Sequence, residues 1–145
     1  MAGSADEIVD QVSKARSLLE DMIVGPIEAS LILGSGLGGL VDRVKAENII
    51  EYKDIPGFVT STAPSHAGRL IIGELGGRRV AIMQGRMHLY EGWSPIEIAL
   101  PIRVLGALGA TRLVVTNAAG ALNTDFDPGD VMQITDHINL TGKNP

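Results

Sequence analysis

Cysteine is absent from the 145 residues of this sequence. Its absence excludes a disulfide framework and any metal site built on thiolates, so we expect no metal. Basic residues are few as well, because 12 Lys and Arg stand against 17 Asp and Glu and give a formal net charge of −5. An acidic chain lacks the broad positive surface that nucleic acid or anionic lipid requires. Any anionic ligand must therefore be held by a local cluster of donors.

Targeting and membrane-spanning patterns are missing too. Residues 1–10 mix small and acidic residues with no basic region and no apolar run, unlike a signal peptide. No stretch is long and apolar enough to cross a bilayer, and no repeat, low-complexity segment or linker divides the chain. We therefore expect a cytoplasmic protein with no membrane partner and a single domain over residues 1–145.

Two segments carry helix signals. The first opens with the capping-box pair Ser4 and Glu7 and keeps an apolar face at helical spacing as far as residue 22. The second opens with a capping-box sequence at 94–97, which includes a proline at the first helical position, and is expected to stop near Gly109.

Short runs of apolar and β-branched residues, each bounded by turn residues, predict strands at 29–33, 48–52, 70–75, 78–84, 113–116 and 131–135. The dipeptide Gly76-Gly77 suits a tight hairpin between two of them, because both positions can take positive φ. Residues 55–68 and 117–130 have no clear period and are expected to be loops. The fold class predicted from this alternation is α/β.

Three of the predicted strands run into unusual loops, at 34–39, 85–92 and 117–120. In open α/β sheets, loops at the carboxyl ends of separate strands can meet over one ligand. Glycines allow main-chain N–H groups to approach an oxyanion, Ser35 adds a hydroxyl, Arg86 adds a planar fork and His88 adds another donor. Each feature alone also suits an ordinary turn or surface position. Their occurrence at successive strand ends favours a phosphate site.

Alternation within the second loop sharpens this prediction. Arg86, His88 and Tyr90 stand two residues apart, so an extended backbone would project all three side chains to the same side. The intervening residues would face the opposite way. A turn at Gly92 would let Glu91 reach His88 and favour its protonated, phosphate-binding form.

A dinucleotide-binding Rossmann module is an alternative from another functional class. Gly34, Gly36 and Gly39 satisfy the G-x-G-x-x-G pattern after a strand, and Glu51 is a candidate ribose-binding acid. Residues 37–44 are few for a crossover helix, and this interpretation leaves the cluster of Arg86, His88 and Glu91 unexplained.

Five segments, in their order and spacing, resemble the trimeric purine nucleoside phosphorylases of the inosine and guanosine type: 33–38, 66–68, 84–92, 115–123 and 129–140. The resemblance implies the purine and uridine phosphorylase fold, a mixed central β-sheet flanked by helices. The family's chains continue well past residue 145, so the sequence resembles their amino-terminal half and an incomplete fold. The family's base-recognising Glu and Asn would lie outside it. Met87 departs from the aromatic or other apolar residue common there, and is expected to face away from the anion.

The resemblance also implies a set of ligand contacts. Ser35, Arg86, His88 and the main-chain N–H of Ala118 would bind phosphate, with His66 contacting or gating it. Tyr90 would contact the ribose, and His88 with Glu91 would form the catalytic pair.

The implied reaction is reversible phosphorolysis of purine ribonucleosides and deoxyribonucleosides to the free base and the sugar 1-phosphate, a step of purine salvage. Phosphate is then a substrate, no cofactor is needed, and a neighbouring subunit of a homotrimer would complete the ribose pocket. An inactive phosphate-binding fragment, which only assembles with a partner, remains an alternative. The sequence does not distinguish 6-oxo from 6-amino purines.

Overall fold

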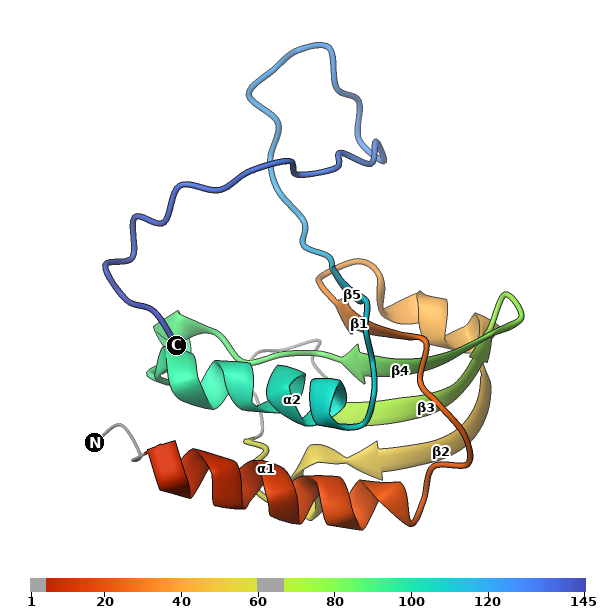
Figure 1. The fold of residues 1–145 in the computed structure, drawn as a ribbon. Helices are drawn as coiled ribbons and strands as arrows, with labels where there is room; N and C mark the ends of the chain where they lie inside the picture. Colours follow the sequence, from red (N-terminus) through yellow and green to blue (C-terminus); the bar gives the residue numbers. More distant parts are fainter. Residues whose placement is uncertain (1–4, 60–66) are drawn as a thin grey trace.

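Five strands form one mixed sheet in the computed structural model, which describes residues 5–59 and 67–145 (Figure 1). The strands are β1 (Ala29–Leu33), β2 (Lys45–Glu51), β3 (Arg69–Leu75), β4 (Arg78–Gln84) and β5 (Leu113–Val115). Their order is β2-β3-β4-β1-β5, with β1 parallel to both neighbours and β2, β3 and β4 antiparallel. This is the α/β mixed sheet that the resemblance implied.

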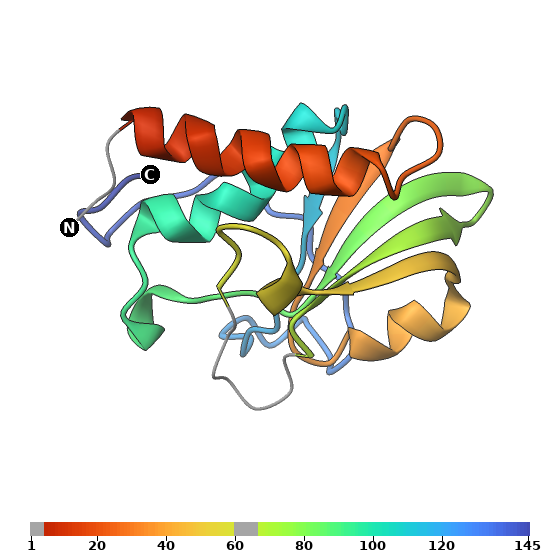
Figure 2. The same cartoon turned by 90° about the horizontal axis from the view of Figure 1, so that it is seen from below.

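Side-chain alternation divides the core between the two faces of the sheet. Helices α1 (Ala5–Glu20) and α2 (Pro95–Ala107) pack together against the first face, where Leu19 and Val104 join the buried residues of the strands (Figures 1 and 2). The short 3-10 helix η1 (Gly38–Arg43) lies against the second face. Because both faces are covered, the strands of the centre read as continuous apolar runs.

The predicted hairpin and the second helix are confirmed. Gly76 and Gly77 have φ values of 60° and 75°, in the left-handed region that a two-residue hairpin turn requires. Ser94 caps α2, because its hydroxyl accepts from the main-chain N–H of Glu97 and the Glu97 carboxylate accepts from the main-chain N–H of Ser94. Neither described helix has the length and apolar content needed to cross a membrane.

The first helix is confirmed from Ala5 onward, and its predicted capping residue Ser4 lies outside the described residues. The predicted strand at 48–52 is longer at its start and ends at Glu51, because Tyr52 begins the 3-10 turn η2 (Tyr52–Asp54). Only residues 55–59, 67 and 68 of the loop predicted at 55–68 are described, and they contain no helix or strand.

The prediction of a strand at 131–135 is wrong. All residues from 117 to 145 are exposed and contain no helix or strand; the segment leaves the sheet after β5, loops outside it and comes back toward α2 (Figure 1). Val131 is 96% exposed and Met132 is 61% exposed. The apolar, β-branched pattern suited a strand, but a strand is stable only when its N–H and C=O groups pair with a neighbour. None of the described strands lies beside this segment.

Candidate functional site

The carboxyl ends of three parallel strands meet at one edge of the sheet. Strands β4, β1 and β5 are adjacent and run in the same direction, so the chain leaves all three at the same side. The loops that begin there are 34–39, 85–92 and 117–120. The predicted convergence of these loops is therefore a property of the fold.

Thr116 joins the three strand ends through hydrogen bonds. Its hydroxyl accepts from the main-chain N–H of Gly34 at 2.9 Å and donates to the carbonyl of Ile32 at 3.0 Å. Its own carbonyl accepts from Nη1 of Arg86 at 2.5 Å. Arg86, which follows β4, is thus held by the residue that follows β5, and β1 lies between these two strands. Sequence analysis missed Thr116, although a hydroxyl residue at the end of a strand is a signal for such a contact.

Gly34 is packed so closely against the end of β5 that it has no room for a side chain. A Cβ atom there would lie 2.4 Å from the Thr116 carbonyl oxygen and 2.8 Å from Cα of Asn117. Glycine is therefore needed at this position to let two main chains approach, which is a steric requirement rather than a conformational one.

Gln84, the last residue of β4, makes a second connection. Its Oε1 accepts from Nε of Arg69 at 2.6 Å, and its Nε2 donates to the Gly38 carbonyl at 3.4 Å. The amide thereby links the end of β4 to β3 and to the glycine-rich loop. Sequence analysis gave this side chain no role.

The loop that carries Arg86 contains a 3-10 turn, which follows the extended residue His88. Met87 is buried and 2% exposed. The expected extended backbone stops at Leu89, where the 3-10 turn η3 (Leu89–Glu91) begins. The turn forms because the main-chain N–H of Glu91 donates to the His88 carbonyl, and Gly92 ends it with φ of 94°.

This turn brings Glu91 and Tyr90 next to His88. A Glu91 carboxylate oxygen accepts from the main-chain N–H of His88 at 2.9 Å and lies 3.7 Å from Nδ1 of the imidazole. The Glu91 side chain is 4% exposed, and the His88 side chain is 22% exposed. The rings of His88 and Tyr90 stack with centroids 4.7 Å apart and planes at 15°. Tyr90 is otherwise 77% exposed.

The other predicted contacts differ in what the structure describes. Ser35 and Ala118 are exposed on the loops that follow β1 and β5, at the edge that also carries Arg86 and His88. His66 lies outside the described residues. Among the described residues, no group of three or more His, Asp or Glu side chains is arranged to hold a metal ion.

The Rossmann alternative is inconsistent with the sheet. In that fold the strand after the glycine-rich loop lies beside the first strand and parallel to it. Here β2 follows that loop but is separated from β1 by β3 and β4, and it pairs antiparallel with β3. Glu51 therefore ends a strand that two others separate from β1, and not the neighbouring strand that the dinucleotide-binding pattern requires.

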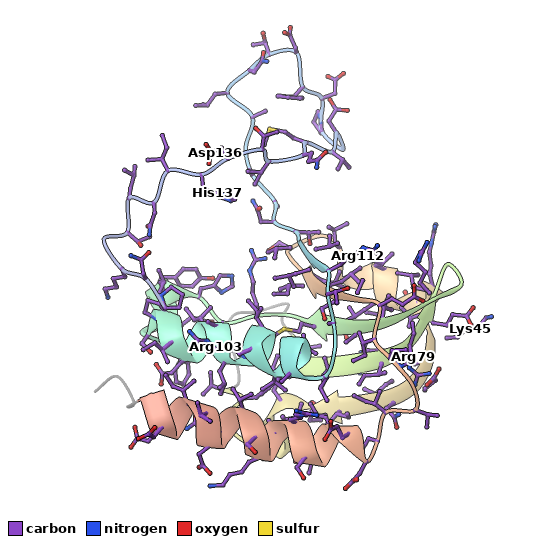
Figure 3. All side chains as sticks on the ribbon, in the orientation of Figure 1. Lys45, Arg79, Arg103, Arg112, Asp136 and His137 are labelled. Atoms are coloured by element: carbon purple, nitrogen blue, oxygen red, sulfur yellow. The ribbon has the colours of Figure 1, made fainter. Side chains whose placement is uncertain are left out.

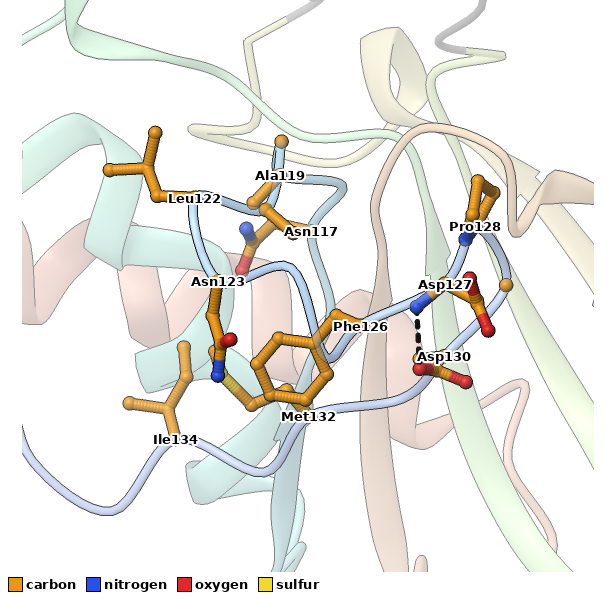
Figure 4. A pocket seen from close by; sticks show the side chains of 13 residues that line it. Asn117, Ala119, Leu122, Asn123, Phe126, Asp127, Pro128, Asp130, Met132 and Ile134 are labelled. Carbon is orange, nitrogen blue, oxygen red and sulfur yellow. Dashed lines mark hydrogen bonds between the residues drawn. The ribbon is translucent and has the colours of Figure 1, made fainter.

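A hollow of about 720 Å³ lies within the turns of residues 117–134 (Figure 4). Phe126, Met132 and Ile134 line it on one side, and a hydrogen bond from the Asp127 N–H to the Asp130 carboxylate closes a turn on the other. Its lining comes from this segment alone, so it is separate from the cluster of Arg86 and His88. His137 also lies on the segment away from the sheet, where its main-chain N–H donates to the adjacent Asp136 (Figure 3).

Residues 30–145 match the family described as Phosphorylase superfamily. Purine nucleoside phosphorylase 1 of Bacillus subtilis (strain 168) is 47% identical over 136 residues, which are 94% of this chain and 50% of that protein. Purine nucleoside phosphorylase of Mus musculus is 49% identical over 133 residues, 92% of this chain and 46% of that protein.

Solved structures give the same result. Isoform 2 of purine nucleoside phosphorylase from Schistosoma mansoni, in complex with cytosine and ribose-1-phosphate, matches with a TM-score of 0.75 and 40% identity. The match covers 83% of this chain and 42% of that one. The chain spans about half the length of the curated relatives it matches. With this identity in sequence and this agreement in fold, the chain belongs to the phosphorylase superfamily and, within it, to the purine nucleoside phosphorylases.

Proposed function

We propose that this protein acts in the reversible phosphorolysis of purine nucleosides and deoxynucleosides, and that it binds phosphate where the loops after β1, β4 and β5 meet. The observation that carries the proposal is the hydrogen bond from Arg86 to the Thr116 carbonyl. It holds a guanidinium at the edge where the glycine-rich loop and the loop with Ala118 also begin. Arg suits a phosphate because its planar fork presents paired donors.

Phosphorolysis requires that the phosphate anion be held in a fixed position. A phosphate oxygen attacks the anomeric carbon, the bond from that carbon to the purine nitrogen breaks, and the base leaves as the sugar 1-phosphate forms. The transition state resembles the oxocarbenium ions of glycoside cleavage, so a phosphate dianion faces a developing cation. No nucleophile of the protein is needed. Arg86, His88, Ser35 and the Ala118 N–H would act by fixing the position and charge of phosphate.

His88 and Glu91 form the pair to which we assign the catalytic role. Glu91 accepts a hydrogen bond from the main-chain N–H of His88 and lies 3.7 Å from Nδ1 of its ring, so the carboxylate holds the His88 main chain in place beside the strand ends. The stacked Tyr90 continues this surface toward solvent, where a ribose would lie. The related protein from Schistosoma mansoni was solved with ribose-1-phosphate, the kind of product that this reaction makes.

Other parts of the proposal rest on membership of the family. We propose a homotrimer in the cytoplasm, a role in purine salvage, His66 as a further phosphate contact, and no cofactor besides the substrate phosphate.

A second candidate has a specific observation in its favour. Strand β5 is one of the two edge strands of the described sheet, and its residues Leu113, Val114 and Val115 are 44%, 48% and 55% exposed. An apolar edge of this kind favours pairing with another strand. The protein would then bind phosphate and assemble without turning over a nucleoside by itself.

One assay separates the two candidates. Inosine is incubated with the purified protein, with and without phosphate, and release of hypoxanthine is followed; phosphate binding is measured in parallel by calorimetry. Phosphate-dependent release supports the enzyme, and binding without release supports the second candidate. Arg86→Ala is compared with Arg103→Ala, which removes the same charge from an exposed position on α2 (Figure 3). If phosphate affinity is the same in both variants, Arg86 does not bind phosphate and the proposed site is wrong.

A further inference from the structure

A buried tyrosine, Tyr52, reaches the main chain immediately before Arg86. It begins η2 at the far end of β2, is 0% exposed, and its ring packs edge-on against Phe58 with centroids 5.5 Å apart. Its hydroxyl donates to the Gly85 carbonyl at 2.8 Å. A phenylalanine would fill the same space, so packing alone does not explain the hydroxyl.

The main chain of Tyr52 is tied to the same place. Its N–H donates to the Gly68 carbonyl at 2.8 Å, and the Gly68 N–H donates to the Gln84 carbonyl at 3.0 Å. Hydrogen bonds thus connect both the side chain and the main chain of Tyr52 to the end of β4. The Tyr52 hydroxyl and the Gly85 carbonyl are therefore each held in place by the surrounding core.

Gly85 is the point at which the chain changes direction. Its φ of 101° lies in the left-handed region, so the chain turns out of β4 there. The carbonyl of Gly85 and the N–H of Arg86 belong to the same planar peptide unit. A hydrogen bond to the Gly85 carbonyl consequently fixes the orientation of this peptide plane, and with it the direction in which the chain continues to Arg86 and His88.

We propose that Tyr52 is a positioning residue for the phosphate site: its hydroxyl holds the Gly85–Arg86 peptide in the orientation that brings Arg86 to Thr116 and sets His88 beside Glu91. This inference rests on the proposed function, since it assumes that Arg86 and His88 bind phosphate. Tyr52 itself touches no substrate. It acts by preorganising donors that would otherwise have to be ordered when the anion binds.

The protonation state of the phenol agrees with this role. Burial raises the pKa of Tyr52 well above its ordinary value. The phenol therefore keeps its proton at neutral pH and can donate to the Gly85 carbonyl.

The test is Tyr52→Phe, which removes one oxygen and keeps the ring. We expect phosphate affinity to fall roughly five- to tenfold, the size of one lost hydrogen bond. Where turnover is measured, the KM for phosphate should rise while the KM for inosine and kcat change less. Phe58→Leu is the matched control, because it loosens the same aromatic contact without touching Gly85. It should lower thermal stability and leave phosphate affinity unchanged at temperatures where the fold is intact.

A conservative replacement provides rescue. Incorporation of 4-aminophenylalanine at position 52 restores a donor on the same ring, and phosphate affinity should recover most of the loss. Wild-type affinity in Tyr52→Phe, or an equal loss in Phe58→Leu, would overturn the inference. Should Tyr52→Phe not fold, the amino variant is compared directly with wild type: phosphate affinity close to that of wild type supports the inference, and a loss of about fivefold or more in a folded amino variant overturns it.

Failure of the inference is distinguishable from failure of the proposed function. Arg86→Ala weakens phosphate binding if the site is correct, whatever the result for Tyr52. If Arg86→Ala weakens binding and Tyr52→Phe does not, the site stands and Tyr52 has only a packing role. If neither weakens it, the site itself is wrong.

Discussion

The hydroxyl of Thr116 accepts a hydrogen bond from the main-chain N–H of Gly34, which joins the ends of β5 and β1 at 2.9 Å. The same hydroxyl donates to Ile32, so one side chain satisfies a donor and an acceptor of the neighbouring strand. The arrangement fixes the start of the glycine-rich loop relative to the carbonyl that holds Arg86.

Thr116→Val should therefore weaken both the fold and the site. Valine keeps the shape but leaves the Gly34 N–H and the Ile32 carbonyl without this partner, which costs about 1–3 kcal/mol in the free energy of unfolding. Urea denaturation measures this loss. Thr116→Ser keeps the hydroxyl and should retain most of the stability. Equal stability of the valine and threonine forms would contradict a structural role for the hydroxyl.

Gly34→Ala should be destabilising for a steric reason. Its Cβ would overlap main-chain atoms at 2.4 Å, and a backbone shift of this kind costs about 1–3 kcal/mol. Gly106→Ala is the matched control, because no atom lies within 4 Å of a Cβ there and the residue is in helix α2. That variant should gain about 0.5–1 kcal/mol, since alanine is the better helix former. Comparable unfolding midpoints for the two variants would argue against the close approach at Gly34.

Arg86→Ala and His88→Ala should each weaken phosphate binding. A hydrogen bond from a charged donor contributes about 1.5–3 kcal/mol, so the expected loss is roughly tenfold to a hundredfold. The difference in affinity between wild type and variant should shrink as salt is added, because screening weakens the attraction between phosphate and the charged side chain that only the wild type has. Calorimetric titrations with phosphate at two ionic strengths give both quantities. Unchanged affinity in both variants would exclude the assigned site.

Ser94→Ala should remove a pH-dependent contribution to the stability of α2. Hydrogen bonds from the Ser94 hydroxyl and then its main-chain N–H hold the pKa of Glu97 below its ordinary value of 4.5. A lowered pKa in the fold means that this contribution is complete above pH 4.5 and disappears as the pH falls through the folded value. The variant should lose about 1 kcal/mol at neutral pH.

Thermal unfolding at neutral and acidic pH checks this prediction. The gap between wild type and Ser94→Ala should narrow in acid, where Glu97 is protonated in both. A gap that stays constant across this range would show that the Glu97 carboxylate is not part of the cap.

Local patterns in the sequence predicted the fold well where a few neighbouring residues decide the structure. The glycines at 76 and 77 require positive φ whatever surrounds them, and the cap at Ser94 is made within four residues. The convergence of three loops was also predictable, because parallel strands end at one edge.

Contacts between distant residues could not be predicted in this way. The side chains of Thr116, Gln84 and Tyr52 form hydrogen bonds with main-chain groups more than 30 residues away, and no spacing rule brings such partners together. The strand predicted at 131–135 failed for the same reason, since pairing depends on a neighbour rather than on the segment itself. His66 and its expected contact remain predictions.

The position of β1 has a consequence for the order in which the protein folds. Strands β3 and β4 are joined by a two-residue turn and can pair as a local hairpin. Strand β1 pairs only with strands that are distant in the sequence. Closing such long loops is slow, so we expect β1 to dock after the hairpin and β5 after β1. The edge with Arg86 and Thr116 would then form last and open first. An anion bound between these loops would hold the strand ends together. Adding phosphate should therefore slow the separation of β1 from β5 more than the opening of the hairpin.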